Sequence, residues 1–284
     1  MNEDTGLLTT EQITEFHRDG VLILKSFYDL TTEIEPIQYA IHSIIAILIN
    51  KYHPSIQQLP FSRENFDSGY QELIYYDRQI GGEIYDAIKQ IPGFIRLVAS
   101  ARHDAIFSQL RQTDLPGVAA AGYGIRIDNP LEEKYRAPWH QDYPAQFRSL
   151  DGLVFWSSLV PITQSLGPVE FCLGSHKNGL APMYTNDPKN PDKSGAYALK
   201  IKDEESLIAS YPHLAPLTQP GDLIIIDFLT LHRSGLNISE RSRWSMQMRY
   251  FNFTEPTGIK IGWKGSFSSG VKVEEVHPEL FCIN

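Results

Sequence analysis

The sequence WHQD at residues 139–142 places an imidazole and a carboxylate two positions apart, at His140 and Asp142. On a strand, residues i and i+2 project from the same face, so both groups would reach one metal ion. The spacing alone is weak evidence, because HRD at 17–19 and HPE at 277–279 repeat it in the same chain. The first of these ends a helical pattern and the second contains a proline, and both are interpreted as solvated surface groups.

His232 is the best candidate for a further ligand beside this pair. Non-haem iron(II) in oxygenases is bound by two histidines and one carboxylate on one face, with open positions for a chelating cosubstrate and dioxygen. His232 ends the apolar strand pattern DLIIIDFLTLH and is followed by the turn-rich RSGLNISE. His176, in the sequence GSHK, is a conceivable fourth ligand, but its place in a Gly-Ser turn favours a structural role.

The strand pattern after that turn, RWSMQMRYFNF, has one polar and one apolar face. Arg243, Ser245, Gln247 and Arg249 fall on the first, and Trp244, Met246, Met248 and Tyr250 fall on the second. On an open sheet the polar face would be wet, whereas in a small barrel it would line a ligand-filled interior. In the second case Arg243 beside Ser245 suits a carboxylate, which a guanidinium binds through two parallel hydrogen bonds.

The elements that would position these groups begin with helices. A capping-box pair at Thr9 and Gln12 and a stop at Gly20 indicate a short amphipathic helix, and a strand pattern follows at residues 21–27. Isoleucine and leucine then recur at helical spacing from 34 to 48. We expect a second helix there, packed on the core.

A further helical segment is predicted from 82 to 112, with a break near Pro92. From residue 117 the pattern changes to short β-branched and aromatic runs separated by turn signals. These runs are DGLVFWSSLV, GPVEFCLG, GDLIIIDFLTLHRSG and RWSMQMRYFNF. The polar, proline-rich segment 181–217 interrupts them and is interpreted as an excursion from the sheet, of the kind that often acts as a lid.

Composition and charge narrow the class of protein. With 284 residues, 42% of them hydrophobic, the chain is predicted to be one soluble domain with a sizeable core. The net charge of −9 opposes a nucleic-acid partner or a polybasic membrane contact. Cys172 and Cys282 are too few for a disulfide framework or a thiolate zinc site, and the N-terminus has no signal-peptide pattern. We therefore expect a cytoplasmic protein whose partner is a small molecule.

The order and spacing of these motifs resemble the phytanoyl-CoA dioxygenase family of iron(II)/2-oxoglutarate oxygenases. The resemblance covers residues 117–253 and the opening LTTEQITEFHRDGVLIL, and its motifs are WHQD, VFWSSLVPITQSLGPVEF, GSHKNG and PGDLIIIDFLTLHRSGLNISERSR. It implies an α+β protein with a mainly β core, a double-stranded β-helix or cupin-like jelly roll flanked by N-terminal helices. The single domain would comprise a helical part (about 1–116), the core (about 117–255) and a C-terminal extension (256–284).

Position by position, the resemblance implies that His140, Asp142 and His232 hold iron and are the catalytic groups. It also implies that Arg243 binds the distal carboxylate of 2-oxoglutarate, with Ser245 beside it and Trp156 next to the cosubstrate. Arg126 and Tyr123, in a segment that aligns poorly, are further candidate contacts. Many members of the family have Asn-Gly where this chain has Leu-Gly before VEF, a departure that alters only a turn.

The implied reaction consumes 2-oxoglutarate and dioxygen, releases succinate and CO2, and hydroxylates an unactivated carbon. An aspartate at 142 leaves no coordination position for a halide, which favours hydroxylation over halogenation. The acidic balance favours a small polar natural-product intermediate, such as a cylindrospermopsin-type compound, and an acyl-CoA hydroxylase is the alternative in the same family. Tyr135, Tyr143, Phe147 and Arg148 flank the metal motif and are candidate substrate contacts or packing residues.

Three interpretations from other classes stay open. A zinc hydrolase also binds its metal through three protein ligands, but it gives no reason for Arg243. A non-catalytic cupin-like protein that binds a metal or ligand would keep the barrel without needing that arginine or an open coordination position. A purely structural domain would leave the triad unused. Metal analysis together with succinate release separates all three from the oxygenase.

Overall fold

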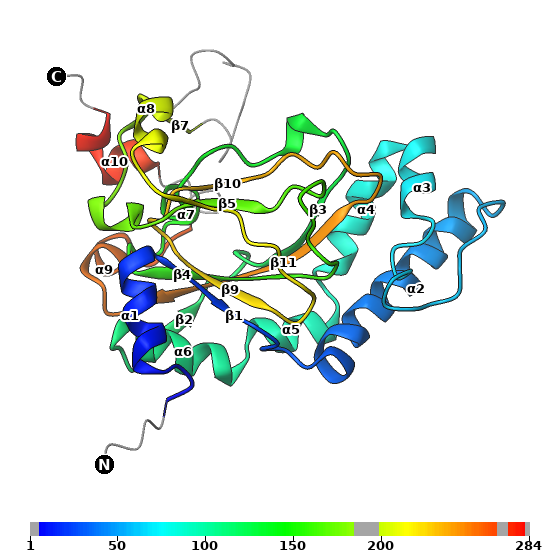
Figure 1. Ribbon diagram of the computed structural model, residues 1–284, viewed down its shortest axis with the longest axis horizontal. Helices are drawn as coiled ribbons and strands as arrows, with labels where there is room; N and C mark the ends of the chain where they lie inside the picture. Colours follow the sequence, from blue (N-terminus) through cyan, green and yellow to red (C-terminus); the bar gives the residue numbers. More distant parts are fainter. Residues whose placement is uncertain (1–5, 185–198, 266–271, 282–284) are drawn as a thin grey trace.

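The structure is a computed structural model that describes residues 6–184, 199–265 and 272–281 (Figure 1). Its strands are β1 Val21–Leu24, β2 Pro116–Val118, β3 Gly124–Asp128, β4 Gly152–Ser158, β5 Val169–Cys172, β6 Met183–Tyr184, β7 Lys200–Ile201, β8 His213–Leu214, β9 Leu223–Asp227, β10 His232–Ser234 and β11 Arg243–Asn252. Its α-helices are α1 Thr10–Asp19, α2 Glu35–Tyr52, α3 Tyr70–Tyr76, α4 Arg78–Ile88, α5 Pro92–Val98, α6 Ala101–Arg111, α7 Asp142–Gln146, α8 Glu204–Ala209, α9 Pro256–Ile261 and α10 Val273–Val276. A π-helix at Leu30–Ile34 and 3-10 turns at Glu133–Tyr135, Ser175–Asn178 and Pro278–Leu280 complete the described elements.

Two antiparallel sheets form the centre of the molecule. The larger has the strand order β1-β9-β4-β11-β2, with β3 also paired to β11, and the smaller has the order β10-β5-β8. Figure 1 shows β5 and β10 above β4, β9 and β11, with α5 and α6 below the larger sheet and α8 and α10 at the upper left. This is the jelly-roll arrangement of a double-stranded β-helix, as the sequence predicts.

The N-terminal segment enters the larger sheet. Helix α1 begins with the predicted capping box, in which Thr9 and Gln12 bond each other's backbone N–H groups, and ends at Gly20 in the left-handed conformation. A Cβ at Gly20 would lie 2.4 Å from both His176 Nδ1 and Thr230 Oγ1, so the close approach as well as the positive φ requires glycine. β1 then pairs along β9. Because β1 belongs to the larger sheet, the predicted boundary at about residue 116 does not separate the helices from the sheet.

Among the remaining helices, α4 packs on β3 and α6 on β2 in the larger sheet, and α2 packs on α4 and α5. α2 buries its isoleucine stripe as predicted, and the predicted break at Pro92 separates α4 from α5. A second break, at Ser100, was not expected: this residue takes an extended conformation and separates α5 from α6. Helix α3 was also not expected. None of the described helices is long and apolar enough to cross a membrane.

Candidate metal centre

His140 and His232 face each other as a single backbone pair. Each donates its N–H to the carbonyl of the other at 3.0 Å, which makes an isolated antiparallel bridge between the segment before α7 and strand β10. Residues opposite each other in such a pair project their side chains to the same side of the sheet. The two imidazole rings accordingly lie with their centroids 4.2 Å apart.

Backbone carbonyls fix the orientation of both rings. His140 Nδ1 lies 2.8 Å from the carbonyl of Pro138, and His232 Nδ1 lies 2.9 Å from the carbonyl of Thr230. A carbonyl oxygen only accepts hydrogen bonds, so each Nδ1 carries a proton, and in the neutral ring the lone pair is then on Nε2. Histidine ligands of metals are usually held in this way, through the nitrogen that does not bind the ion.

Asp142 reaches the histidines from the first residue of a helix. The expectation that His140 and Asp142 share a strand is wrong, because Asp142 begins α7 and its backbone N–H donates to the carbonyl of Phe228 at 2.9 Å. Gln141 between them is extended and buried. Its amide donates to the carbonyls of Gly179 and Leu229 at 2.8 and 2.7 Å, which turns it away from the pair. One extended residue therefore gives the same-side geometry that a strand would give.

His232 does not end the strand that precedes it. The pattern DLIIIDFLTLH predicts one strand, but β9 ends at Asp227, and His232 begins β10 in the smaller sheet. The turn between them is fixed by Asp227, whose carboxylate accepts the backbone N–H of Leu229 at 2.7 Å. Thr230 in the same turn donates its hydroxyl to the carbonyl of Gly20 at 3.0 Å. The turn thus carries His232 from one sheet to the other.

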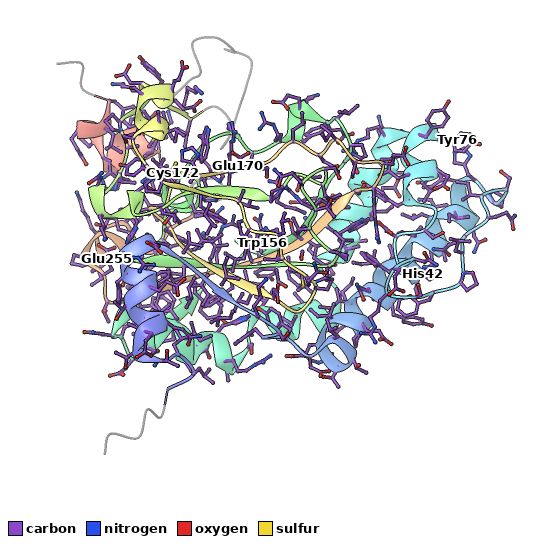
Figure 2. All side chains as sticks on the ribbon, in the orientation of Figure 1. His42, Tyr76, Trp156, Glu170, Cys172 and Glu255 are labelled. Atoms are coloured by element: carbon purple, nitrogen blue, oxygen red, sulfur yellow. The ribbon has the colours of Figure 1, made fainter. Side chains whose placement is uncertain are left out.

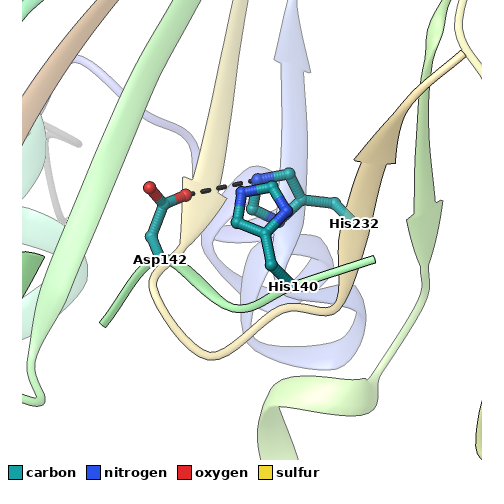
Figure 3. Close-up of side chains that lie close together, drawn as sticks. All are labelled: His140, Asp142 and His232. Atoms are coloured by element: carbon teal, nitrogen blue, oxygen red, sulfur yellow. Dashed lines mark ion pairs between the residues drawn. The ribbon is translucent and has the colours of Figure 1, made fainter. Parts of the chain in front are cut away.

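The three side chains converge from these separate elements (Figure 3). One ligand atom from each of His140, Asp142 and His232 lies within 4.8 Å of the others, and this is the only cluster of its kind among the described residues. Burial, together with the neighbouring His232, lowers the pKa of His140 to about 3, so this imidazole is neutral at pH 7. Neutral imidazole is the form that binds a metal ion.

The donor set fits a divalent cation. Asp142 Oδ2 lies 3.2 Å from His232 Nε2 and has no hydrogen-bond donor. With the His232 proton on Nδ1, two lone pairs face each other across that gap, an arrangement that a cation between them would stabilise. Two imidazoles and one carboxylate on one side of a cavity are the ligands of non-haem iron(II) sites.

Arg249 holds the other oxygen of the carboxylate. Its Nε donates to Asp142 Oδ1 at 2.8 Å, and its two terminal nitrogens donate to the carbonyl of Gly122 and to the Gln247 side chain. Burial alone would raise the pKa of Asp142, but the charge of Arg249 holds it well below the usual value. Asp142 is therefore ionised, with one oxygen bonded to Arg249 and the other turned to the histidines.

A cavity of about 50 Å³ adjoins these groups. Its walls include His140, Asp142, Val154, Trp156, Val169, Ile226, His232, Ser234, Arg126, Arg233, Arg243, Ser245, Gln247 and Arg249. All four residues of the polar face of β11 line it, so the barrel-interior interpretation of that face is confirmed and the solvated one is wrong. Trp156 on β4 lies opposite Gln247 in the sheet register and near the middle of the molecule (Figure 2).

Arg243 is 1% exposed and is largely engaged by the protein. It lies 2.9 Å from Asp128 Oδ2, donates to Ser234 Oγ at 2.9 Å and contacts the carbonyl of Gly167. Asp128 also pairs through Oδ1 with Arg126 at 2.7 Å, so two guanidinium groups share one carboxylate. The hydroxyl of Ser245 and the Nε of Arg243 are buried without a partner. Unused donors therefore meet at this wall beside a carboxylate that two guanidinium groups share.

Several residues singled out in the sequence lie away from the cavity. Tyr143 and Phe147 are buried in the hydrophobic core, and Arg148 bonds the carbonyls of Gln146 and Ala120. Tyr123 packs against Phe94. These four are packing residues.

Two further histidines have structural contacts. His176 has its Nε2 3.3 Å from the carbonyl of His17, at the end of α1. The sequence predicts a surface position for His277, but the residue is only 9% exposed and its Nε2 lies 2.9 Å from Tyr143 Oη. The proline that follows it begins a 3-10 turn rather than a solvated tail. In the 17–19 motif, by contrast, Asp19 pairs with the exposed Arg18 as expected.

Sequence reasoning missed two partners of the site. Asp128 balances Arg243, and Arg249 orients Asp142. The alternation along β11 already placed Arg249 on the cavity face, so a signal existed for it. No sequence signal pointed to Asp128, because its contact with Arg243 depends on the register between β3 and β11, where the two residues are directly paired.

Comparison with known proteins agrees with this site. The family profile described as phytanoyl-CoA dioxygenase matches residues 16–245. The chain therefore belongs to the phytanoyl-CoA dioxygenase family and is an iron(II)/2-oxoglutarate-dependent oxygenase. A search of curated protein sequences finds no match.

Solved structures show the same fold at low identity. EctD from S. alaskensis, crystallised with 2-oxoglutarate and 5-hydroxyectoine, is 20% identical, with a TM-score of 0.59 over 88% of this chain and 78% of that one. The epimerase SnoN from nogalamycin biosynthesis, in complex with Fe3+, alpha ketoglutarate and nogalamycin RO, is 17% identical, with a TM-score of 0.54 over 92% and 91%. The carbocyclase SnoK of the same biosynthesis is 14% identical, with a TM-score of 0.54 over 87% and 85%.

Proposed function

We propose that this oxygenase hydroxylates an unactivated carbon of a small polar molecule, a natural-product intermediate of which a cylindrospermopsin-type compound is one example. The observation that carries the reaction type is the convergence of His140, Asp142 and His232 beside the buried Arg243 and Ser245. The solved neighbours from nogalamycin biosynthesis support a natural-product substrate.

His140, Asp142 and His232 would hold iron(II), which when bound supplies the activation of dioxygen that side chains lack. The protein keeps these ligands in the required protonation states. Each imidazole presents Nε2 because its Nδ1 proton bonds a backbone carbonyl, and Arg249 keeps Asp142 ionised. With the carboxylate present in the triad, no position is left for a halide, which supports hydroxylation over halogenation.

Arg243 and Ser245 would bind the distal carboxylate of 2-oxoglutarate. The Nε of Arg243 is buried without a partner, so a second carboxylate would accept its hydrogen bond. The buried hydroxyl of Ser245 has no partner and would donate to that carboxylate. Trp156, 3% exposed, forms an adjacent wall of the cavity and would limit the access of water to the reacting groups.

Replacement of Asp142 by alanine tests the proposal. We expect Asp142→Ala to lower the affinity for Fe²⁺ or Co²⁺ about 100-fold or more and to reduce succinate release to background, because the only anionic ligand is removed. Asp19→Ala is the matched control, since it removes the carboxylate of a second His-x-Asp pattern whose partner is the exposed Arg18.

Metal affinity is measured by calorimetry and succinate by a coupled assay with iron(II), ascorbate and 2-oxoglutarate. If Asp142→Ala bound metal and released succinate like the parent protein, the triad assignment would be wrong. A protein that bound zinc and released no succinate under any condition would instead favour a hydrolase or a binding protein.

A further inference from the structure

Gln247 lines the cavity at the metal centre, and neither metal binding nor the site of the distal carboxylate accounts for its side chain. It lies between Ser245 and Arg249 on the polar face of β11. Trp156 on β4 and Gly124 on β3 are opposite it in the sheet register. Because Gly124 has no side chain, β3 does not cover the amide of Gln247, which is only partly buried. The amide is therefore accessible from the cavity.

One hydrogen bond fixes the direction in which this amide faces. Arg249 donates from Nη2 to Oε1 of Gln247 at 2.9 Å. A guanidinium group only donates hydrogen bonds, so the atom that it contacts must be the amide oxygen. The amide nitrogen Nε2 is directed away from Arg249 and has no hydrogen-bond partner among the residues that the structure describes. Gln247 thus presents a donor that these residues do not use.

Arg249 also connects this amide to the metal ligands. The guanidinium group that bonds Gln247 donates from Nε to Asp142 Oδ1 at 2.8 Å. The other oxygen of Asp142 faces His232 Nε2. The unused donor of Gln247 therefore lies toward the metal end of the polar face, and the Arg243 end is farther along the strand.

Unused donors follow one another along this face. The Nε of Arg243 and the hydroxyl of Ser245 are buried without partners, and the Gln247 amide comes two residues later. Neighbours on one face of a strand are about 6.6 Å apart, which is twice the rise per residue. An extended five-carbon dicarboxylate has a similar length. A dicarboxylate bound at one end by Arg243 and Ser245 would therefore bring its other end beside Gln247.

We propose that the Gln247 amide donates a hydrogen bond to the C1 carboxylate of 2-oxoglutarate, at the end that binds the metal. The inference rests on the proposed function, because it takes the site of the distal carboxylate from Arg243 and Ser245. A carboxylate that binds an ion through one oxygen keeps its second oxygen as an acceptor. That second oxygen is the partner of the amide.

Two substitutions test this donor. Gln247→Glu keeps an oxygen for Arg249 and replaces the donor by a second acceptor, whereas Gln247→Leu removes both groups. Calorimetry measures the binding of 2-oxoglutarate to protein loaded with Co²⁺ under anaerobic conditions. We expect Gln247→Leu to weaken this binding about 5–10-fold through the loss of one hydrogen bond. Gln247→Glu should weaken it further, because two carboxylates then repel each other.

The affinity for Co²⁺ without 2-oxoglutarate separates a contact with the cosubstrate from a merely structural role. If Gln247 acted only by holding Arg249, Gln247→Leu would disturb Asp142 and weaken Co²⁺ binding. We expect both variants to bind Co²⁺ like the parent. Gln79→Glu, on the exposed surface of α4, is the matched control for the added charge and should bind 2-oxoglutarate like the parent. Circular dichroism and the melting temperature verify that the variants are folded.

The proposal is overturned if either variant of Gln247 binds 2-oxoglutarate like the parent. It is also overturned if the affinity for Co²⁺ falls by the same factor as the affinity for 2-oxoglutarate. A parent protein that binds Co²⁺ but not 2-oxoglutarate would contradict the proposed function as well. Binding by the parent that both variants retain would contradict only the assignment of Gln247.

Discussion

The two faces of strand β11 are both turned away from solvent, yet they have different roles. One face packs Trp244, Met246, Met248 and Tyr250 into the hydrophobic core under the helices. The other presents Arg243, Ser245, Gln247 and Arg249 to the cavity. Burial alone does not distinguish them. The two faces differ in whether their groups have partners. Neighbouring side chains fill the space around the apolar face, whereas the polar face includes buried hydrogen-bond donors without acceptors at Arg243 and Ser245.

Replacement of Met246 by alanine should give the largest effect on stability, because this fully buried side chain leaves a void in a close-packed core. We expect Met246→Ala to lower the free energy of unfolding by about 2–5 kcal/mol in urea titrations. The affinity of the folded protein for Co²⁺ should not change. A change in that affinity would show that the two faces are coupled.

Replacement of Arg249 by glutamine should change metal binding instead. Loss of the Arg249 bond frees Asp142 to rotate, and removal of a partner that orients a ligand typically weakens metal affinity about 10–100-fold. We expect this loss for Co²⁺ binding to Arg249→Gln, measured by calorimetry on folded protein. Met246→Ala serves as the comparison, since a merely structural role for Arg249 would make the two variants behave alike.

His103 packs against the apolar face of β11 and should make the stability of the folded protein depend on pH. It stacks on Phe155 and contacts Tyr250, and burial lowers its pKa to about 3. Unfolded histidine titrates near 6.5, so the unfolded chain takes up a proton first and the folded protein loses stability as the pH falls below that value. Between pH 7 and 5 this loss is about 2 kcal/mol for one histidine.

We expect His103→Gln to remove that part of the pH dependence, as measured by urea unfolding at both pH values. The contribution of His140 is the same in both proteins and cancels in the difference. An unchanged pH dependence would mean that His103 is protonated in the folded protein.

The smallest effect is expected for Ser245→Ala. Because the Ser245 hydroxyl is buried without a partner, its removal should leave the stability unchanged or raise it by about 1 kcal/mol. The KM for 2-oxoglutarate should rise about 5–10-fold, because one hydrogen bond contributes about 1 kcal/mol net. A loss of stability with an unchanged KM would place Ser245 with the packing residues.

Local patterns predicted much of this molecule. The capping box of α1, the stripe of α2 and the alternation along β11 all depend on neighbours in sequence, and the structure confirms each of them. The predicted ligands His140, Asp142 and His232 do converge, although the predicted local structure is wrong at Asp142 and at His232. The i+2 spacing gave the right geometry because Gln141 is extended, even though Asp142 begins a helix.

The missed features depend on pairing between distant segments. A continuous apolar run gave no sign that the chain changes sheets between Asp227 and His232, because the turn there is held by Asp227 itself and by Gly20 from the N-terminal segment. The burial of His277 depends on Tyr143, and the role of Asp128 depends on β3 lying beside β11. None of these contacts leaves a periodic trace in the sequence.

The hydrogen bonds from the two imidazoles to the carbonyls of Pro138 and Thr230 belong to the polypeptide alone. The ligand side chains are already oriented before an ion binds, so little of the binding energy is needed to order the chain. Zinc fingers, by contrast, are unfolded without metal. We therefore expect the protein to stay folded when the metal is removed.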